Sequence, residues 1–353
     1  MPMTSVTTSL RRTLSLGDLI FIVVGTVIGS GIFLTPGAVV RSAGSGGVAL
    51  LAWIIGGVLS LLGALTFAEL GAATPDSGGL YAYVRDAFGP LPAFLYGWTM
   101  FLVIGSGSLA TVSQGVTGMI GVLWAYEGWQ YVTFSAGETV DPQRVFARGI
   151  VIGTAALIGI YVLANIGYFA ALGVAGVAAS TRVASHAASV VLGPRAGTVV
   201  ALVILVSIFS AANGMTLTLP RLFFAMARDG VFFAKLAEVH PRFATPAAAI
   251  VSSSVWSAVL VLTGSFEQLL TYVVFMSWLW FALAALAIFA YRRRPAKSDQ
   301  VFRTPGYPAT PILFILAAML IVMNTLIARP VQSAIGLGFA VLGVPAYFIW
   351  RRR

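Results

Sequence analysis

Ten apolar segments divide this chain, and each is long enough to cross a lipid bilayer, which takes about 20 residues. They lie near 16–39, 47–71, 91–112, 115–136, 148–171, 197–227, 246–263, 267–291, 309–328 and 331–350. Only 9% of the 353 residues are charged, against about 25% in a soluble domain. Because open sheet edges cannot face lipid, we predict an all-α, polytopic membrane protein. It would have about ten transmembrane helices in a single domain, residues 1–353.

The positive charges predict how these spans are oriented. With the N-terminus in the cytoplasm and ten alternating spans, 17 Lys and Arg residues lie on the cytoplasmic side. Only four lie outside: Arg41, Arg182, Arg195 and Arg329. Cytoplasmic loops of membrane proteins carry the excess of Lys and Arg, so both termini are predicted to be cytoplasmic in a cell membrane. Topology thus accounts for the net charge of +10, and we predict no nucleic-acid partner.

The third and fourth segments follow each other with almost no loop. Gly115, Gly118 and Gly121 offer the only turn chemistry there. The alternative is a single long, kinked helix, which would reverse the sidedness of every later span. The charge distribution favours two separate spans.

Residues that support catalysis or cofactor binding are absent or scattered. The chain has no cysteine, so it can form no disulfide and no thiolate metal site. His186 and His240 lie in predicted loops and belong to no metal-binding pattern. No nucleotide-binding Gly-rich loop and no defensible catalytic triad is present. We therefore predict no cofactor, no metal site and no enzyme activity.

The first apolar segment carries glycines in its middle. Each glycine costs a helix interior about 1 kcal/mol relative to alanine, so the helix can open here and expose backbone N–H groups. Such groups suit a carboxylate, and secondary transporters build their sites from broken helices of this kind. Close helix packing through small residues is the alternative. The candidate binding residues are Gly25, Ile28, Gly29, Ser30 and Gly31.

The fourth segment contains an acidic residue followed by glycine, between two tryptophans. A carboxylate inside lipid is costly and marks a functional site by default. Freed carbonyls and this carboxylate can receive an ammonium group, which the aromatic rings can cover. The alternative is an aromatic belt at the membrane interface. The candidate binding residues are Trp124, Ala125, Tyr126, Glu127 and Gly128.

Three further stretches leave two interpretations each. The loop 75–85 is either a shaped re-entrant or gating loop or a turn before an interfacial helix. Arg221 either snorkels to the interface or pairs with a cytoplasmic carboxylate. Ser207, Ser210 and Asn213 are either interhelical hydrogen-bonding groups or ion ligands, and the first role is more frequent.

These blocks together resemble the amino-acid permeases of the amino acid–polyamine–organocation superfamily, and most of all its L-type and bacterial antiporters. The resemblance implies a leucine-transporter-type inverted-repeat fold in which two broken helices hold the substrate. Amides around Gly29, Ser30 and Gly31 would hold its carboxylate, and carbonyls around Trp124, Ala125 and Glu127 its amino group. Tyr126 and Gly128 would shape the side-chain pocket. The matching blocks are 25–33, 75–83, 124–130, 136–138, 141–142, 225–230, 239–243 and 245–246.

The chain also departs from the family pattern. Members usually have about twelve spans, and the Trp124–Trp129 motif belongs to their sixth helix, whereas here it lies in the fourth. The family's fourth and fifth helices are therefore expected to be missing, which leaves the first repeat incomplete. Loss of an even number of spans keeps later helices in the same orientation.

The sequence thus predicts alternating-access transport of amino acids or related amines, with a coupling proton or a counter-substrate as a further partner. The alternative is an internally deleted derivative that binds amino acids without carrying them. Animal members use a cysteine to attach a heavy chain, and this chain has none. No disulfide-linked heavy chain is therefore predicted.

Overall fold

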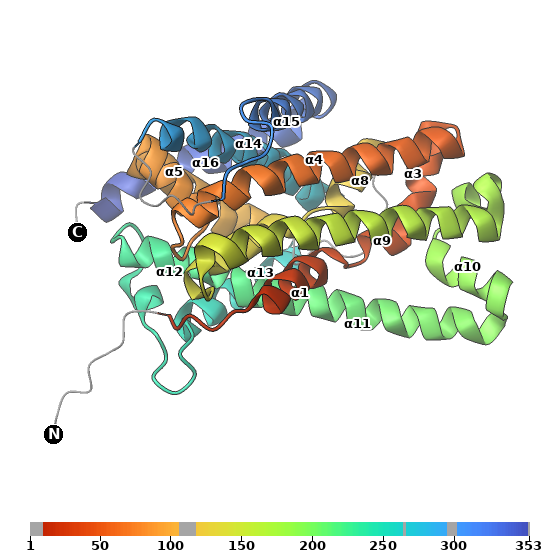
Figure 1. Cartoon of the computed structure of the whole chain (residues 1–353), viewed down its shortest axis with the longest axis horizontal. Helices are drawn as coiled ribbons and strands as arrows, with labels where there is room; N and C mark the ends of the chain where they lie inside the picture. Colours follow the sequence, from red (N-terminus) through yellow and green to blue (C-terminus); the bar gives the residue numbers. More distant parts are fainter. Residues whose placement is uncertain (1–9, 106–117, 264–265, 295–301, 352–353) are drawn as a thin grey trace.

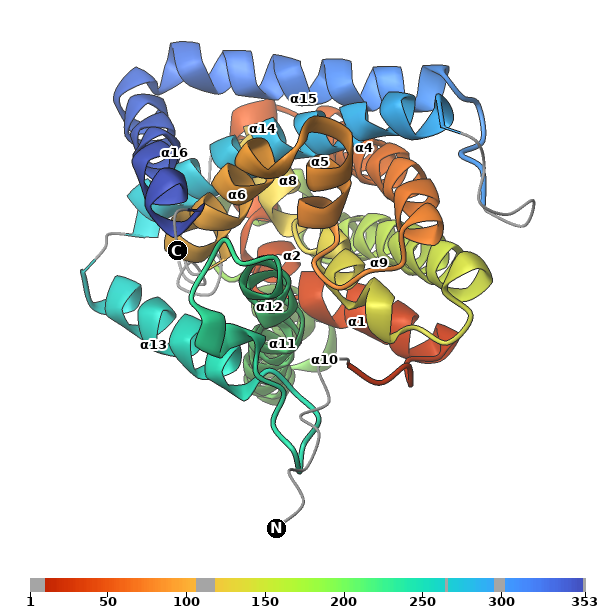
Figure 2. The ribbon, with the colours of Figure 1, turned by 90° about the vertical axis from the view of Figure 1, so that its left-hand side faces the viewer.

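A computed structural model describes residues 10–105, 118–263, 266–294 and 302–351. Within these ranges the chain is a bundle of helices (Figures 1 and 2) without any strand element, apart from an isolated bridge between Leu14 and Thr139. In the described residues, six helices are long and apolar enough to cross a membrane. The prediction of an all-α, polytopic membrane protein is therefore confirmed.

Six predicted spans correspond to long helices. The segment 197–227 forms two helices in line, which are separated only by Leu219. The six spans are α4 (Gly46–Ala73), α9 (Pro142–Ala179), α11 (Pro194–Thr218) with α12 (Pro220–Arg228), α14 (Phe266–Arg292), α15 (Ala309–Ala328) and α16 (Pro330–Arg351).

The other four predicted spans consist of shorter pieces. Segment 16–39 forms α1 (Leu16–Val27), α2 (Gly31–Leu34) and α3 (Pro36–Ala43), and segment 115–136 forms α8 (Gly118–Ala125) and the 3₁₀-helix η2 (Trp129–Glu138). Segment 91–112 forms α6 (Pro90–Thr99) and the π-helical η1 (Met100–Ile104), and its last residues lie outside the described ranges. The fourth of these spans, segment 246–263, forms the single helix α13 (Ala247–Thr263). Segments 16–39 and 115–136 are interrupted at residues 28–30 and 126–128, at the glycines where the sequence predicts that the helices open.

Two helices have no counterpart among the predicted spans. The loop 75–85 contains the start of α5 (Leu80–Phe88), whose Tyr81 and Tyr83 are fully buried. It therefore inserts into the bundle and does not lie along an interface. Helix α10 (Val183–Leu192) connects α9 to α11. Both have only nine or ten residues, too few to register as a bilayer span.

Both termini lie at one end of the bundle, which we name the terminal end (Figure 1). Thr13 N donates to Glu138 O at 2.8 Å, so the end of η2 is also there. At the opposite end, Arg41 Nη1 donates to Ala178 O at 2.6 Å and joins the ends of α3 and α9. The chain thus leaves the terminal end after α5 and returns to it by η2. The described parts of this region, residues 91–105 and 118–136, are therefore placed as in two spans and not as in one kinked helix.

The helices differ in how far the bundle surrounds them. In α14, 72% of the apolar window is buried inside the bundle, whereas in the combined helix Pro194–Arg228 only 11% is buried. Helix α11 therefore borders the bundle (Figure 2) and presents most of its side chains to the outside.

Candidate functional site

The first helix break lies between α1 and α2. Ile28 caps the end of α1 with non-helical backbone angles (φ −73°, ψ 79°). Helix α2 begins at Gly31 without a side-chain cap on its N-terminus. The first N–H groups of a helix have no partner inside the helix, so the amides that start α2 remain free for a ligand. Thr35 has helical angles and continues α2 into α3.

The second break lies between α8 and η2, at Tyr126, Glu127 and Gly128. Gly128 has φ 127°, a left-handed conformation that glycine adopts without strain. Beyond the break, η2 is a ten-residue 3₁₀-helix. Such long 3₁₀ runs are uncommon and often mark a functional hinge.

The two breaks are packed directly against each other. A Cβ added to Gly31 would lie 2.7 Å from Cα of Ala125, and one added to Gly128 would lie 3.0 Å from Val27 Cγ2. Thr26 Oγ1, whose nearest acceptor is Ile22 O at 2.6 Å, also lies 3.2 Å from Gly128 O. The glycines therefore serve both to open the helices and to bring the openings together.

Tyr161, from the middle of α9, joins both breaks. Its hydroxyl lies 3.1 Å from Val27 O and 2.9 Å from Ala125 O, and it can donate to either carbonyl. Its ring contacts Tyr126 and Trp53 in a fully buried aromatic cluster. No sequence pattern predicts this role, because a tyrosine in an apolar helix resembles any core aromatic residue.

A small cavity separates the breaks from α11. Its volume is about 40 Å³, room for only a few water molecules. The cavity therefore has no room for a larger ligand in this conformation. The lining residues are Thr26, Val27, Gly29, Ser30, Gly31, Trp124, Ala125, Glu127, Ala211 and Met215.

Glu127 lies in this cavity and is 6% exposed. Gln130 Nε2 donates to Glu127 Oε1 at 2.7 Å, and Gln130 Oε1 accepts from Gly128 N at 3.1 Å. None of the ion pairs between described residues includes Glu127. An acidic group held in place without a basic partner is suited to a cationic ligand.

Six of the ten sequence-predicted residues therefore line one cavity, and four do not. Gly25 lies one turn before the break, where an added Cβ would lie 3.5 Å from Ser210 Oγ. Ile28 O accepts from Ser207 Oγ at 2.5 Å, so this serine joins α1 to α11. The Tyr126 ring packs into the aromatic cluster, and Gly128 shapes the break behind the cavity. Thr26, Val27, Ala211 and Met215 line the cavity but were not predicted.

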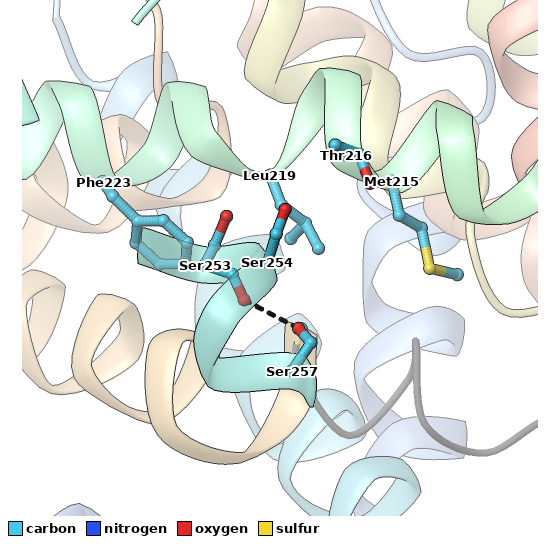
Figure 3. Close-up of a pocket in the computed structure, with 8 residues that line it drawn as sticks. Met215, Thr216, Leu219, Phe223, Ser253, Ser254 and Ser257 are labelled. Carbon is cyan, nitrogen blue, oxygen red and sulfur yellow. Dashed lines mark hydrogen bonds between the residues drawn. The ribbon is translucent and has the colours of Figure 1, made fainter. Parts of the chain in front are cut away.

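A second cavity lies on the other side of Met215, between α11 and α13 (Figure 3). Its volume is about 10 Å³, enough for about one water molecule. Three serines of α13 line one side of it, opposite Met215, Leu219 and Phe223, and Ser257 Oγ donates to Ser253 O at 2.8 Å. Met215 therefore separates the candidate site from a small polar space next to it.

Ion pairs close the terminal end below the site. Arg85 of α5 contacts Asp229 at 2.6 Å, and Arg221 of α12 contacts Glu138 of η2 at 2.7 Å. Arg221 thus pairs with a carboxylate, which was one of its two predicted roles. Burial and the Asp229 carboxylate raise the pKa of Tyr81, so its hydroxyl stays protonated and donates to Asp229 at 2.9 Å.

With this geometry established, comparison with known proteins identifies the kind of protein. The sequence profile of the family described as amino acid permease matches residues 14–113 and 105–349. The chain belongs to the amino acid permease family. Its relatives are transporters and not enzymes, so this permease is a multi-pass membrane transporter.

Curated relatives match over nearly the whole permease. The serine/threonine exchanger SteT of Bacillus subtilis is 26% identical, with 98% of each chain covered. The human cystine/glutamate transporter is 26% identical over 97% of this chain and 85% of its own length. The human b(0,+)-type amino acid transporter 1 is 27% identical over 98% and 89%.

The permease is shorter than these relatives. Its alignment with SteT has 431 positions, which exceeds the 353 residues of the chain by 78. At least that many alignment positions therefore have no residue in this chain, enough for about two spans with their loops. The two profile matches meet at residues 105–113, where the sequence predicts that the third span runs into the fourth. Both findings support the loss of two helices.

Proposed function

We propose that this permease carries amino acids or related amines across the cytoplasmic membrane by alternating access. The observation that carries the proposal is the single cavity lined by both helix breaks and by Glu127. Transporters with discontinuous helices place the substrate at the midplane of the bilayer, between the half-helices.

The two breaks offer groups of opposite polarity. The uncapped amides at Ser30 and Gly31 suit the substrate carboxylate, because the N-terminus of a helix carries partial positive charge. Glu127 and the nearby carbonyls of the second break suit its ammonium group. Trp124 lines the same cavity and can cover the cation.

Alternating access requires the contracted cavity to open toward each side in turn. Met215 and Trp124 line the cavity with long side chains whose rotation would widen it. Release at the terminal end would require the Arg85–Asp229 and Arg221–Glu138 pairs to separate. We propose that the terminal end is cytoplasmic, as the charge distribution predicts.

Uptake into proteoliposomes tests the proposal. The protein is assayed with labelled amino acids and amines, with and without internal counter-substrate and with imposed proton gradients. Uptake of at least one substrate is expected, with at least a tenfold loss in Glu127→Gln. That variant keeps an oxygen for the Gln130 hydrogen bond and removes only the charge. Uptake that is flat for every substrate under every gradient would refute transport.

The missing positions favour a second candidate, an internally deleted derivative that binds amino acids without carrying them. Thermal stabilisation by the same panel distinguishes the two. Stabilisation that Glu127→Gln abolishes, with no uptake, would support the binding protein. Uptake with exchange would support the transporter, with a proton or counter-substrate as its coupling partner. Because the chain has no cysteine, we propose that it functions without a disulfide-linked heavy chain.

A further inference from the structure

A polar cavity lies at the opposite end of the bundle, away from the candidate substrate site. It is bounded by the end of α9, by α10 and by the start of α11, and its volume is about 620 Å³. Arg182 and His186 line it together with five hydroxyl groups. Those groups belong to Ser180, Thr181, Ser185, Ser189 and Thr198.

The charge around this cavity is positive, and the described segments that surround it carry no carboxylate. No Asp or Glu occurs between residues 28 and 68 or between residues 142 and 228. These segments supply α3, α9, α10, α11 and the first part of α4, which meet at this end. Arg182 and His186 are exposed, and the ion pairs of the described chain include neither of them. Arg41, bonded to Ala178 O, adds another positive charge nearby.

The backbone at the cavity also favours an anion. Helix α10 begins at Val183 with no side-chain cap on its N-terminus. Its first amides therefore lack an intrahelical partner and carry partial positive charge. Ser180 Oγ accepts from Arg182 N at 3.3 Å and keeps its own hydrogen to donate, whereas Ser189 Oγ already donates to Ser185 O at 2.9 Å. Basic side chains, hydroxyls and free amides together form a donor set for phosphate oxygens.

An apolar strip on α11 begins beside this cavity. Its side chains are spaced three and four residues apart, so they share one helix face. All are more than half exposed: Val199 (58%), Leu202 (61%), Val203 (56%) and Val206 (64%). A free phosphate would leave this strip unused, whereas acyl chains would cover it.

We propose that this cavity and the adjoining strip bind an anionic phospholipid from the leaflet at the opposite end. Arg182 and His186 would hold its phosphate, and its acyl chains would lie along α11. Clusters of basic residues at the ends of membrane helices recognise anionic head groups in this way. The proposal does not depend on transport, because it concerns a separate surface.

Lipid-dependent thermal stability tests it. Delipidated protein in detergent is titrated with phosphatidylglycerol, phosphatidylcholine and inorganic phosphate, and the apparent Tm is measured. Phosphatidylglycerol is expected to give a saturable rise of several degrees, and the other two at most a quarter of it. The Arg182→Gln/His186→Gln double variant should lose most of that rise. Arg329→Gln, which removes an arginine between α15 and α16 and outside the cavity lining, should keep it.

Three results would overturn the proposal. An equal rise with inorganic phosphate would reduce it to a small-anion site, and an equal rise with phosphatidylcholine would remove the charge requirement. A full response in the double variant would place the lipid elsewhere. Native mass spectrometry of the wild-type protein and of Arg182→Gln alone provides a second measurement if the double variant is poorly folded. Equal retention of phosphatidylglycerol by the two would refute the site.

Discussion

Tyr161 shows how one hydroxyl can hold both helix breaks in place. It donates to Val27 O or Ala125 O, two carbonyls that the breaks free from helical bonding. Tyr161→Phe should lower the stability by about 1 kcal/mol, because it removes a buried hydrogen bond and the donor that Ala125 O has from Tyr161, whereas Val27 O keeps Gly29 N at 2.7 Å. It should also weaken amino-acid binding, since the breaks would no longer be fixed relative to each other. Apparent Tm and ligand-dependent stabilisation measure the two effects.

Tyr126→Phe is the matched control. Tyr126 belongs to the same aromatic cluster, and its buried hydroxyl has no hydrogen-bond partner in the described structure. Removal of that hydroxyl should therefore leave the stability unchanged or slightly raise it. If the two variants lose stability equally, the Tyr161 hydroxyl does not fix the breaks.

The candidate site residues differ in how visible they are in the sequence. Glu127 and the glycines around Ser30 stand out because a carboxylate and adjacent glycines are costly inside an apolar helix. Met215 and Tyr161 were missed for the opposite reason, since they are ordinary residues for a buried helix face. Their roles depend on which helices pack together, which local sequence does not specify.

At the scale of the elements, Gly31 sets the distance between the two broken helices. Gly31→Ala would place a Cβ 2.8 Å from Ala125 Cβ and 2.7 Å from its Cα, atoms that cannot rotate away. A stability loss of about 1–3 kcal/mol is expected from this overpacking. At Gly29 an added Cβ would lie 3.6 Å from Ala211 Cβ, an ordinary contact, so Gly29→Ala should be nearly neutral. Equal apparent Tm values for the two variants would contradict the direct contact between the breaks.

The ion pair between α12 and η2 should matter more than its exposed neighbour. Arg221 contacts Glu138 at 2.7 Å and both side chains are almost buried, whereas those of Arg228 and Asp76 are 39% and 30% exposed. Loss of one partner from a buried pair costs about 3–5 kcal/mol, and an exposed pair contributes less than about 1 kcal/mol. Arg221→Met should therefore lower the apparent Tm far more than Arg228→Met. The Arg221→Met/Glu138→Met double variant should recover much of the loss, and no recovery would show that the pair is not the cause.

The spans were easier to predict than their internal structure. Apolar length alone located α4, α14, α15 and α16 to within two residues, whereas α9 begins six residues before the predicted span and ends eight residues after it. It could not locate α5 or α10, because helices of nine or ten residues are buried by their neighbours and not by lipid. The glycines indicated where two spans break, but not that the breaks pack against each other.

At the scale of the whole molecule, the end of the bundle at which each element begins and ends agrees with the orientation predicted from the Lys and Arg residues. The elements between α4 and α9 leave the terminal end and return to it, as the hydrogen bond from Thr13 to Glu138 requires. This arrangement agrees with the predicted loss of an even number of helices, which would keep the later helices in their orientation. Among the six long helices of the described structure, the combined helix of α11 and α12 is the least buried by its neighbours.

Labelling with a membrane-impermeant maleimide tests the orientation directly, because the natural chain has no cysteine to interfere. Ser42→Cys and Thr181→Cys place exposed thiols at the opposite end, before and after the shortened region. Both should react in intact cells. Thr13→Cys and Arg242→Cys, at the terminal end, should react only after permeabilisation, because Lys and Arg concentrate on that side. If Ser42→Cys and Thr181→Cys reacted from different sides, an odd number of spans would separate α3 from α10. If all four patterns were reversed, the termini would lie outside the cell.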